Sequence, residues 1–156
     1  MKSILFAAGA ALLLAAPAAH AANPALEAPL HQFLDSFNKG DAKGARASHV
    51  AAPSIIDEIG PHAWSGPGAF DRWSRDLDKD AKIRGITDQS VTLGAPTREV
   101  ISGSKAYVIT PATYAYKQKG VPMREVAQMT FALTKVGAGW KISAWTWTGP
   151  DPSPVK

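Results

Sequence analysis

The hydrophobic period of this chain changes near residue 83, from a helical spacing to the alternation that is typical of strands. Before that point, large apolar side chains recur every three or four positions, which predicts an amphipathic first helix. Asn23 and Pro24 suit the cap and first turn of this helix, although Pro29 favours a regular start nearer Ala28. Gly40 can end it in a left-handed conformation. The apolar positions are Leu26, Leu30, Phe33, Leu34 and Phe37.

Two more helices and one strand are expected in this first half. Small residues after an aspartate predict a short helix over 41–49, and a short strand follows over 54–59. After a Gly-Pro turn, Ser65 or Gly66 is suited to cap a third helix, with Pro67 at its first position. The apolar residues expected to face the core from this helix are Phe70, Trp73 and Leu77.

Alternation in the second half predicts strands separated by turns that contain glycine or proline. Such short links between successive strands favour an antiparallel, strongly curved meander. Pro111 lies inside a long strand and indicates a bulge or an edge position, because proline cannot donate a ladder hydrogen bond. The expected strands are 87–93, 98–102, 106–116, 121–135 and 140–148.

Helices followed by a meander predict an α+β domain, in which three N-terminal helices pack on a strongly curved, mainly antiparallel sheet. A bent sheet with helices on its concave side leaves a cone-shaped cavity, where a ligand would bind. We expect this domain over 22–148. The proline-rich segment 149–156 is expected to form a flexible tail without ladder pairing.

The first 21 residues have the pattern of a secretory signal peptide. Lys2 precedes an apolar run over 4–16, and Ala19-His20-Ala21 gives a small-residue cleavage pattern. The apolar run is shorter than the roughly 20 residues that a membrane-spanning helix needs. We therefore expect cleavage after Ala21, a periplasmic or secreted protein, and no membrane attachment once the signal is removed.

Composition excludes several classes of site. The chain has no cysteine, so it forms neither disulfides nor thiolate metal sites, and its histidines lack metal-ligand spacing. The formal net charge of +4 is spread along the chain, whereas nucleic-acid binding usually shows as a basic stripe with interleaved aromatics. No phosphate-binding glycine loop or nucleophile elbow is present. We expect no metal, no cofactor and no nucleic-acid partner.

Several short motifs, taken in order, resemble the nuclear transport factor 2-like superfamily, which includes SnoaL-like proteins and ketosteroid isomerases. The resemblance covers about 26–148 and implies the cone-shaped fold already expected. It also implies a homodimer, since members of the superfamily commonly pair through the outer face of the sheet. The motifs are Phe37-Asn38-Lys39-Gly40-Asp41, Asp57, Trp64-Ser65-Gly66, Gly139-Trp140-Lys141-Ile142, Trp145 and Trp147.

Asp57 is the candidate catalytic residue. The resemblance implies this role because ketosteroid isomerases place an aspartate general base nine residues before the glycine that opens the third helix, and Asp57 stands nine before Gly66. Two departures from that pattern matter. Phe33 occupies the position of a hydroxyl-bearing tyrosine, and Glu125 is the nearest match to a second donor on a later strand. A missing donor to a developing oxyanion forfeits about 3–4 kcal/mol.

The remaining site candidates are expected to line the pocket. Alternation places Glu125 and Met129 on the inward, more apolar side of their strand, although Glu125 could instead form a salt bridge or lie at the rim. Glu58 is expected to point away from Asp57 into solvent. Aromatic residues such as these usually form a core or an interface, and an apolar ligand wall is the sharper interpretation. The predicted pocket residues are Phe33, Trp64, Glu125, Met129, Trp145 and Trp147.

Three functions remain open at this stage. The first is an exported domain that binds a small apolar or carbonyl-containing molecule. The second is an isomerase, dehydratase or cyclase that uses Asp57 as a general base. The third is a dimerisation module without catalysis. What lines the cavity separates the first two: a second protonatable group beside Asp57 favours chemistry, and a purely aromatic and aliphatic lining favours binding.

Overall fold

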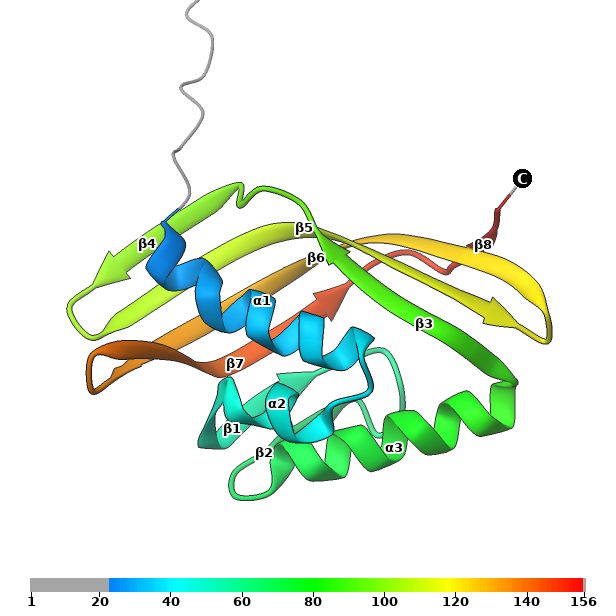
Figure 1. Ribbon diagram of the computed structural model, residues 1–156, viewed down its shortest axis with the longest axis horizontal. Coiled ribbons are helices and arrows are strands. Elements are labelled where there is room, and N and C mark those ends of the chain that lie inside the picture. Colours follow the sequence, from blue (N-terminus) through cyan, green and yellow to red (C-terminus); the bar gives the residue numbers. More distant parts are fainter. Residues whose placement is uncertain (1–22, 156) are drawn as a thin grey trace, which may run out of the picture.

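A computed structural model describes residues 23–155, so the predicted signal peptide lies outside the described residues. Three helices, α1 (Pro24–Asn38), α2 (Ala42–Ala47) and α3 (Ala69–Arg84), lie together on one side of a sheet (Figure 1). The strands are β1 (His49–Ile56), β2 (Ala63–Ser65), β3 (Ile86–Leu93), β4 (Arg98–Ser102), β5 (Lys105–Gln118), β6 (Val121–Val136), β7 (Gly139–Thr148) and β8 (Ser153–Pro154).

The sheet is mixed, mostly antiparallel and unclosed. Its main path runs β2-β1-β7-β6-β5-β3, with β4 also paired to β5 and β8 to β6. Among the strands of residues 23–155, only the β1–β7 pairing is parallel, and it brings the first of these strands beside the last long one. The expected α+β class is confirmed, with the helices interrupted by β1 and β2.

The helix boundaries differ from the expected ones at two places. The short helix ends at Ala47, and His49 begins β1 because this segment pairs with β7. The third helix begins at Ala69 rather than at Pro67. Gly66 and Gly68 both have left-handed φ values, of 79° and 70°, so the helical conformation starts only after them. The first helix begins at Pro24, with the Asn23 side chain accepting a hydrogen bond from the amide of Ala25.

The strands of the second half agree with the alternation to within a few residues. Pro111 interrupts no pairing between β5 and β6, since it lies opposite Gln128 in an unbroken register. On its other side β4 ends its pairing at Ile109 and β3 begins at Ala112, so Pro111 occupies the gap between two neighbours. The expectation that no residue after 148 pairs is wrong: β8 pairs with β6.

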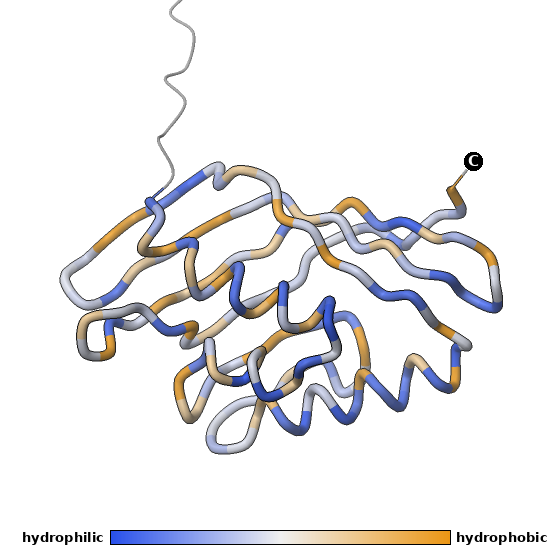
Figure 2. Tube along the Cα trace, in the orientation of Figure 1, coloured by the Kyte–Doolittle hydropathy of each residue, from blue (hydrophilic) through white to orange (hydrophobic). Residues whose placement is uncertain are grey.

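The core lies between the helices and the concave face of the sheet. Figure 2 shows mostly hydrophilic colours along α3, whose buried residues are few, while α1 buries Leu26, Leu30 and Phe33. Phe33 is 1% exposed, and its ring packs edge-on against three other aromatic rings. This aromatic cluster joins the helices to the sheet, and three of its rings form part of the wall of the cavity described next. Its other members are His49, Phe70, Trp73 and Trp145.

Candidate functional site

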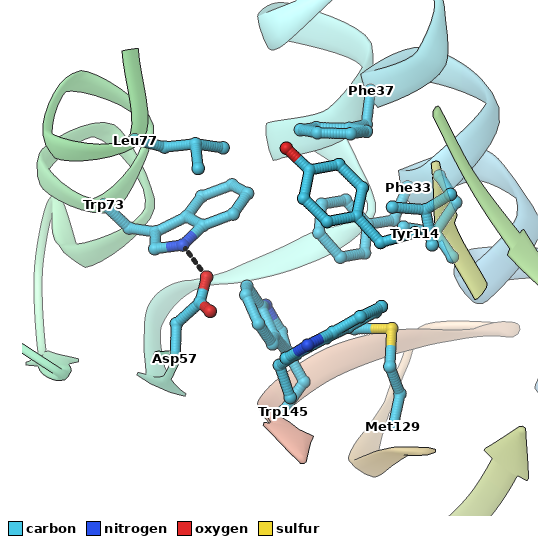
Figure 3. A pocket seen from close by; sticks show the side chains of 11 residues that line it. Phe33, Phe37, Asp57, Trp73, Leu77, Tyr114, Met129 and Trp145 are labelled. Carbon is cyan, nitrogen blue, oxygen red and sulfur yellow. Dashed lines mark hydrogen bonds between the residues drawn. The ribbon is translucent and has the colours of Figure 1, made fainter. Parts of the chain in front are cut away.

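A small apolar pocket of about 50 Å³ lies between α1, α3 and the inner face of the sheet (Figure 3). Its walls are aromatic and aliphatic apart from one carboxyl and one phenol. The carboxyl belongs to Asp57, at the end of β1, and the phenol belongs to Tyr114 on β5. The lining residues are Phe33, Leu34, Phe37, Asp57, Trp73, Leu77, Val91, Tyr114, Met129, Trp145 and Trp147.

Asp57 is held by hydrogen bonds to both of its carboxylate oxygens. The indole Nε1 of Trp73 donates to Oδ2 over 2.7 Å, and the backbone amide of Glu58 donates to Oδ1 over 2.7 Å. Burial raises the pKa of Asp57, while the bonds from Trp73 and Glu58 oppose that rise. The result is a fixed carboxyl whose proton affinity is raised above its ordinary value.

The aromatic wall opposite Asp57 is fixed by Trp145. Its ring lies 5.0 Å from that of Trp73, nearly perpendicular at 86°, and 5.6 Å from that of Phe33. Its Nε1 donates to Nε2 of His49 over 3.1 Å, so the polar edge of the indole is turned away from the pocket. The ring therefore offers the pocket an apolar surface.

Tyr114 is the second protonatable group in the lining. Its hydroxyl donates to Oε1 of Gln89 over 2.5 Å, and burial raises its pKa. The hydroxyl is thus neutral at ordinary pH and its proton is engaged outside the pocket. Tyr114 therefore contributes its aromatic ring to the cavity wall, while its hydroxyl is already engaged with Gln89 (Figure 3).

Four of the six predicted pocket residues line the cavity together with Asp57: Phe33, Met129, Trp145 and Trp147. Trp64 does not, because it lies in β2, where its Nε1 donates to Oδ2 of Asp76 on α3 over 2.8 Å. Glu125 faces inward as the alternation indicates, but it lies behind Trp147, whose Nε1 donates to it over 2.6 Å. The functional roles of these residues stay predictions.

Six lining residues were not among the predicted site residues: Leu34, Phe37, Trp73, Leu77, Val91 and Tyr114. Phe37, Trp73 and Leu77 were assigned to the core from their helical spacing, and that spacing does not distinguish a core from a cavity wall. Val91 and Tyr114 meet across β3 and β5 as direct partners. The inward direction of Tyr114 follows from alternation only once Pro111 is known not to shift the register.

A second hollow of about 190 Å³ lies on the helical side of the pocket. The two hollows share three wall residues, Phe37, Trp73 and Leu77, which form the partition between them. Phe37 and Leu77 are only partly buried, whereas Trp73 is buried, so these two are the less constrained members of this partition. The partition is therefore where the small pocket can most readily be enlarged.

Within residues 23–155, no cluster of three or more histidine or carboxylate side chains has the arrangement of a metal site. None of the helices over this range is both long and apolar enough to cross a membrane.

Solved structures with a similar fold cover most of this chain. A hexachlorocyclohexane dehydrochlorinase, LinA type 2, superposes with a TM-score of 0.70 at 14% identity and covers 85% of this chain and 87% of its own. A ketosteroid isomerase-like protein from Erwinia carotovora atroseptica has a TM-score of 0.63 at 18% identity, covering 82% and 95%.

A nuclear transport factor 2-like superfamily protein from Salmonella enterica serovar Typhimurium has a TM-score of 0.65 at 14% identity, covering 81% of this chain and 89% of that protein. No protein-family profile and no curated protein sequence matches this chain. At these identities the likeness shows the fold alone, and this chain has the nuclear transport factor 2-like fold.

Proposed function

We propose that this protein is an exported small-molecule-binding protein whose apolar pocket takes a small ligand beside Asp57. The observation that carries the proposal is the lining itself: apolar walls surround one fixed carboxyl. Apolar walls favour removal of a hydrocarbon surface from water, and a single polar group orients the ligand. The export rests on the signal-peptide pattern in residues 1–21.

The size of the cavity limits the ligand. About 50 Å³ is well below the roughly 150 Å³ of an engineered apolar cavity that binds benzene. A ligand with an aromatic ring therefore has to displace part of the wall. Leu77 lies between the pocket and the 190 Å³ hollow, so its movement would join the two. The protein is then suited to compact ligands, of ring size at most.

The polar end of the ligand is expected to be a hydrogen-bond donor. Each oxygen of Asp57 already accepts one hydrogen bond and retains capacity for another. A hydroxyl or N–H that reaches this carboxyl satisfies it further, whereas a bare hydrocarbon gains nothing there. We therefore expect phenol to bind more tightly than benzene.

The alternative is an enzyme that uses Asp57 as a general base. Its raised pKa brings the carboxyl closer to the working range of a base at neutral pH, which favours this alternative. The names of two structural neighbours describe a dehydrochlorinase and a ketosteroid isomerase-like protein. Against it, Phe33 brings no hydroxyl to the pocket and the Tyr114 hydroxyl is bonded to Gln89. Binding is therefore the better-supported function.

Titration of the protein with xenon, benzene and phenol tests the proposal, with indole ¹H–¹⁵N NMR signals of Trp73, Trp145 and Trp147 as reporters. We expect all three probes to shift these signals and phenol to bind at least about threefold more tightly than benzene. Asp57→Asn should reduce that preference, and Leu77→Ala should strengthen binding of both rings. Signals that stay unmoved by every probe at millimolar concentration would overturn the proposal.

A homodimer through the outer face of the sheet is a further part of the proposal. Val126 on β6 and Tyr107 on β5 are 58% and 39% exposed, although both are large apolar residues. Exposed apolar groups on a sheet face favour association with another surface. Sedimentation velocity tests the pairing: a dimer that Val126→Arg converts to monomer supports it, and a wild-type monomer contradicts it.

A further inference from the structure

A second group of polar side chains lies beyond Trp147 and outside the pocket lining. Its centre is Glu125, which is 1% exposed on the inner face of β6. The main chain covers it at Gly149, where a Cβ atom would collide with Oε1 of Glu125 and with Ala127. Glu125 is therefore a carboxyl enclosed between Trp147 and the segment that leads to β8.

The two oxygens of Glu125 differ in their surroundings. Oε1 accepts the hydrogen bond from Trp147 Nε1, whereas Oε2 is buried without a hydrogen-bond partner among the described donors. A buried carboxylate oxygen without a donor is unfavourable, because the hydrogen bonds that it made to water are not replaced. Glu58 is the candidate donor, because its carboxyl lies near enough to that of Glu125 for each to affect the pKa of the other.

Two carboxyl groups can share a hydrogen bond only when one of them carries a proton. We propose that Glu58 donates a shared proton to Glu125 and thereby ties the Asp57 loop, residues 57–62, to strand β6. Glu58 is exposed, as expected, so the proposal requires only that one edge of its carboxyl reaches Glu125. Because β1 ends at Ile56, strand alternation does not fix the direction of this side chain.

The charges around the pair support this assignment. Burial raises the pKa of Glu58 to about 7, with the carboxylates of Glu125 and Asp57 adding to the rise and Arg84 opposing it. Burial likewise raises the pKa of Glu125. The ionisable groups that face the cluster are Arg84 from α3, Tyr114 and Tyr116 from β5, and, beside Asp57, Asp80 from α3 and His62 from the loop.

The loop that this proton would hold is the one that carries Asp57. The backbone amide of Glu58 donates to Oδ1 of Asp57, so the position of Glu58 helps to set the direction of that carboxyl. Within the loop, the amide of Asp57 donates to the carbonyl of His62, and the amide of His62 donates to that of Ile59. Loss of the shared proton should loosen this loop. The consequence for ligand binding rests on the proposed function, but the loosening itself does not.

Hydrogen exchange of the Asp57 and His62 amides, without ligand, tests the proposal at pH 6 and pH 8 after correction for intrinsic rates. In the wild type we expect protection to fall about tenfold between these pH values, the effect of one pKa unit. Glu58→Gln keeps an N–H donor that does not titrate, so its protection should stay high at both. Glu58→Ala should lose protection at both.

The Trp147 indole signal gives a second, independent measurement. It should titrate with a midpoint near pH 7 in the wild type and lose that midpoint in Glu58→Gln, because the proton near Glu125 is then replaced by an amide hydrogen. Asp35→Asn removes an exposed carboxylate on α1 and should leave both measurements unchanged. Protection that is equal at pH 6 and pH 8 in the wild type, or a Glu58→Gln variant that behaves like Glu58→Ala, would overturn the shared proton.

Discussion

His49 begins β1 and Asp57 directly follows its last residue. His49 is a member of the aromatic cluster, and Asp57 contacts that cluster through Trp73. His49 is 6% exposed, with the rings of Phe33 and Phe70 each 4.8 Å from its own. Asp57 is less buried and faces the pocket. The two residues are alike in carrying an ionisable group into an apolar region, so their differences show what separates a structural residue from a functional one.

The difference lies in what remains free for a ligand. Trp145 Nε1 can only donate, so Nε2 of His49 must be the acceptor and Nδ1 carries the proton. That proton is directed at the carbonyl of Ala45, 3.0 Å away. Both nitrogens are used inside the protein. The carboxylate of Asp57 is also bonded, yet its oxygens retain capacity and a cavity lies beside them. Spare hydrogen-bonding capacity beside a cavity, more than burial, marks the site.

Removal of the His49 ring should give the largest loss of stability in this comparison. In His49→Ala the buried Nε1–H of Trp145 loses its acceptor and a cavity opens beside Phe33 and Phe70. Together these effects should lower the free energy of unfolding by about 4 kcal/mol. Urea denaturation at pH 7 measures the loss. His31→Ala, at an exposed position on α1, is the control and should change stability by less than about 0.5 kcal/mol. A loss below about 1 kcal/mol in His49→Ala would contradict a structural role.

Acid should destabilise the wild type through His49 more than it destabilises His49→Gln. Burial lowers the pKa of His49 from 6.5 to about 4, so the unfolded chain binds more protons between these values. The contribution is therefore complete above pH 6.5 and is lost as the pH falls toward 4, by up to about 3 kcal/mol. Glutamine can still accept from Trp145 but does not titrate. As the pH falls from 6.5 toward 4, the unfolding free energy of the wild type should decrease relative to that of His49→Gln. A difference between the two proteins that does not change with pH would contradict the lowered pKa.

The strands and turns could be predicted from the sequence because their signals are local. Three turns between strands contain a glycine with positive φ, a conformation that glycine adopts without strain. These glycines are Gly103, Gly120 and Gly137. The start of α3 could not be predicted as well. Ser65, Gly66 and Pro67 each suit a helix start, and the choice between them depends on the backbone around Gly68 and on the pairing of β2 with β1.

Part of the site could also be predicted, because some of its residues lie in segments with a local sequence pattern. Asp57 followed from its spacing to Gly66, and the inward side of Met129 and Glu125 followed from alternation in a long, regular strand. Glu58 is exposed, as expected, although β1 ends before it. Trp64 lies outside the lining, because a short strand replaces the expected helix opening and the indole is bonded to Asp76. Contacts between distant segments, such as Trp73 with Asp57, leave no local pattern to read.

Asp57→Asn should have the smallest effect on stability, and its pH dependence should have the opposite sign to that of His49. The amide introduced by this substitution can satisfy only one of the two donors, Trp73 and the Glu58 amide, but the substitution also removes a partly buried charge. The net change at pH 7 should therefore stay within about 1 kcal/mol. Because the folded pKa of Asp57 is raised, its contribution is complete below the unfolded pKa and is lost as the pH rises through the folded value. The variant should therefore gain stability relative to the wild type between pH 4 and pH 7, as measured by urea denaturation. A variant that instead loses relative stability over this range would show that the carboxylate is a structural anion, and Asp57 would then belong with His49 among residues that serve the fold.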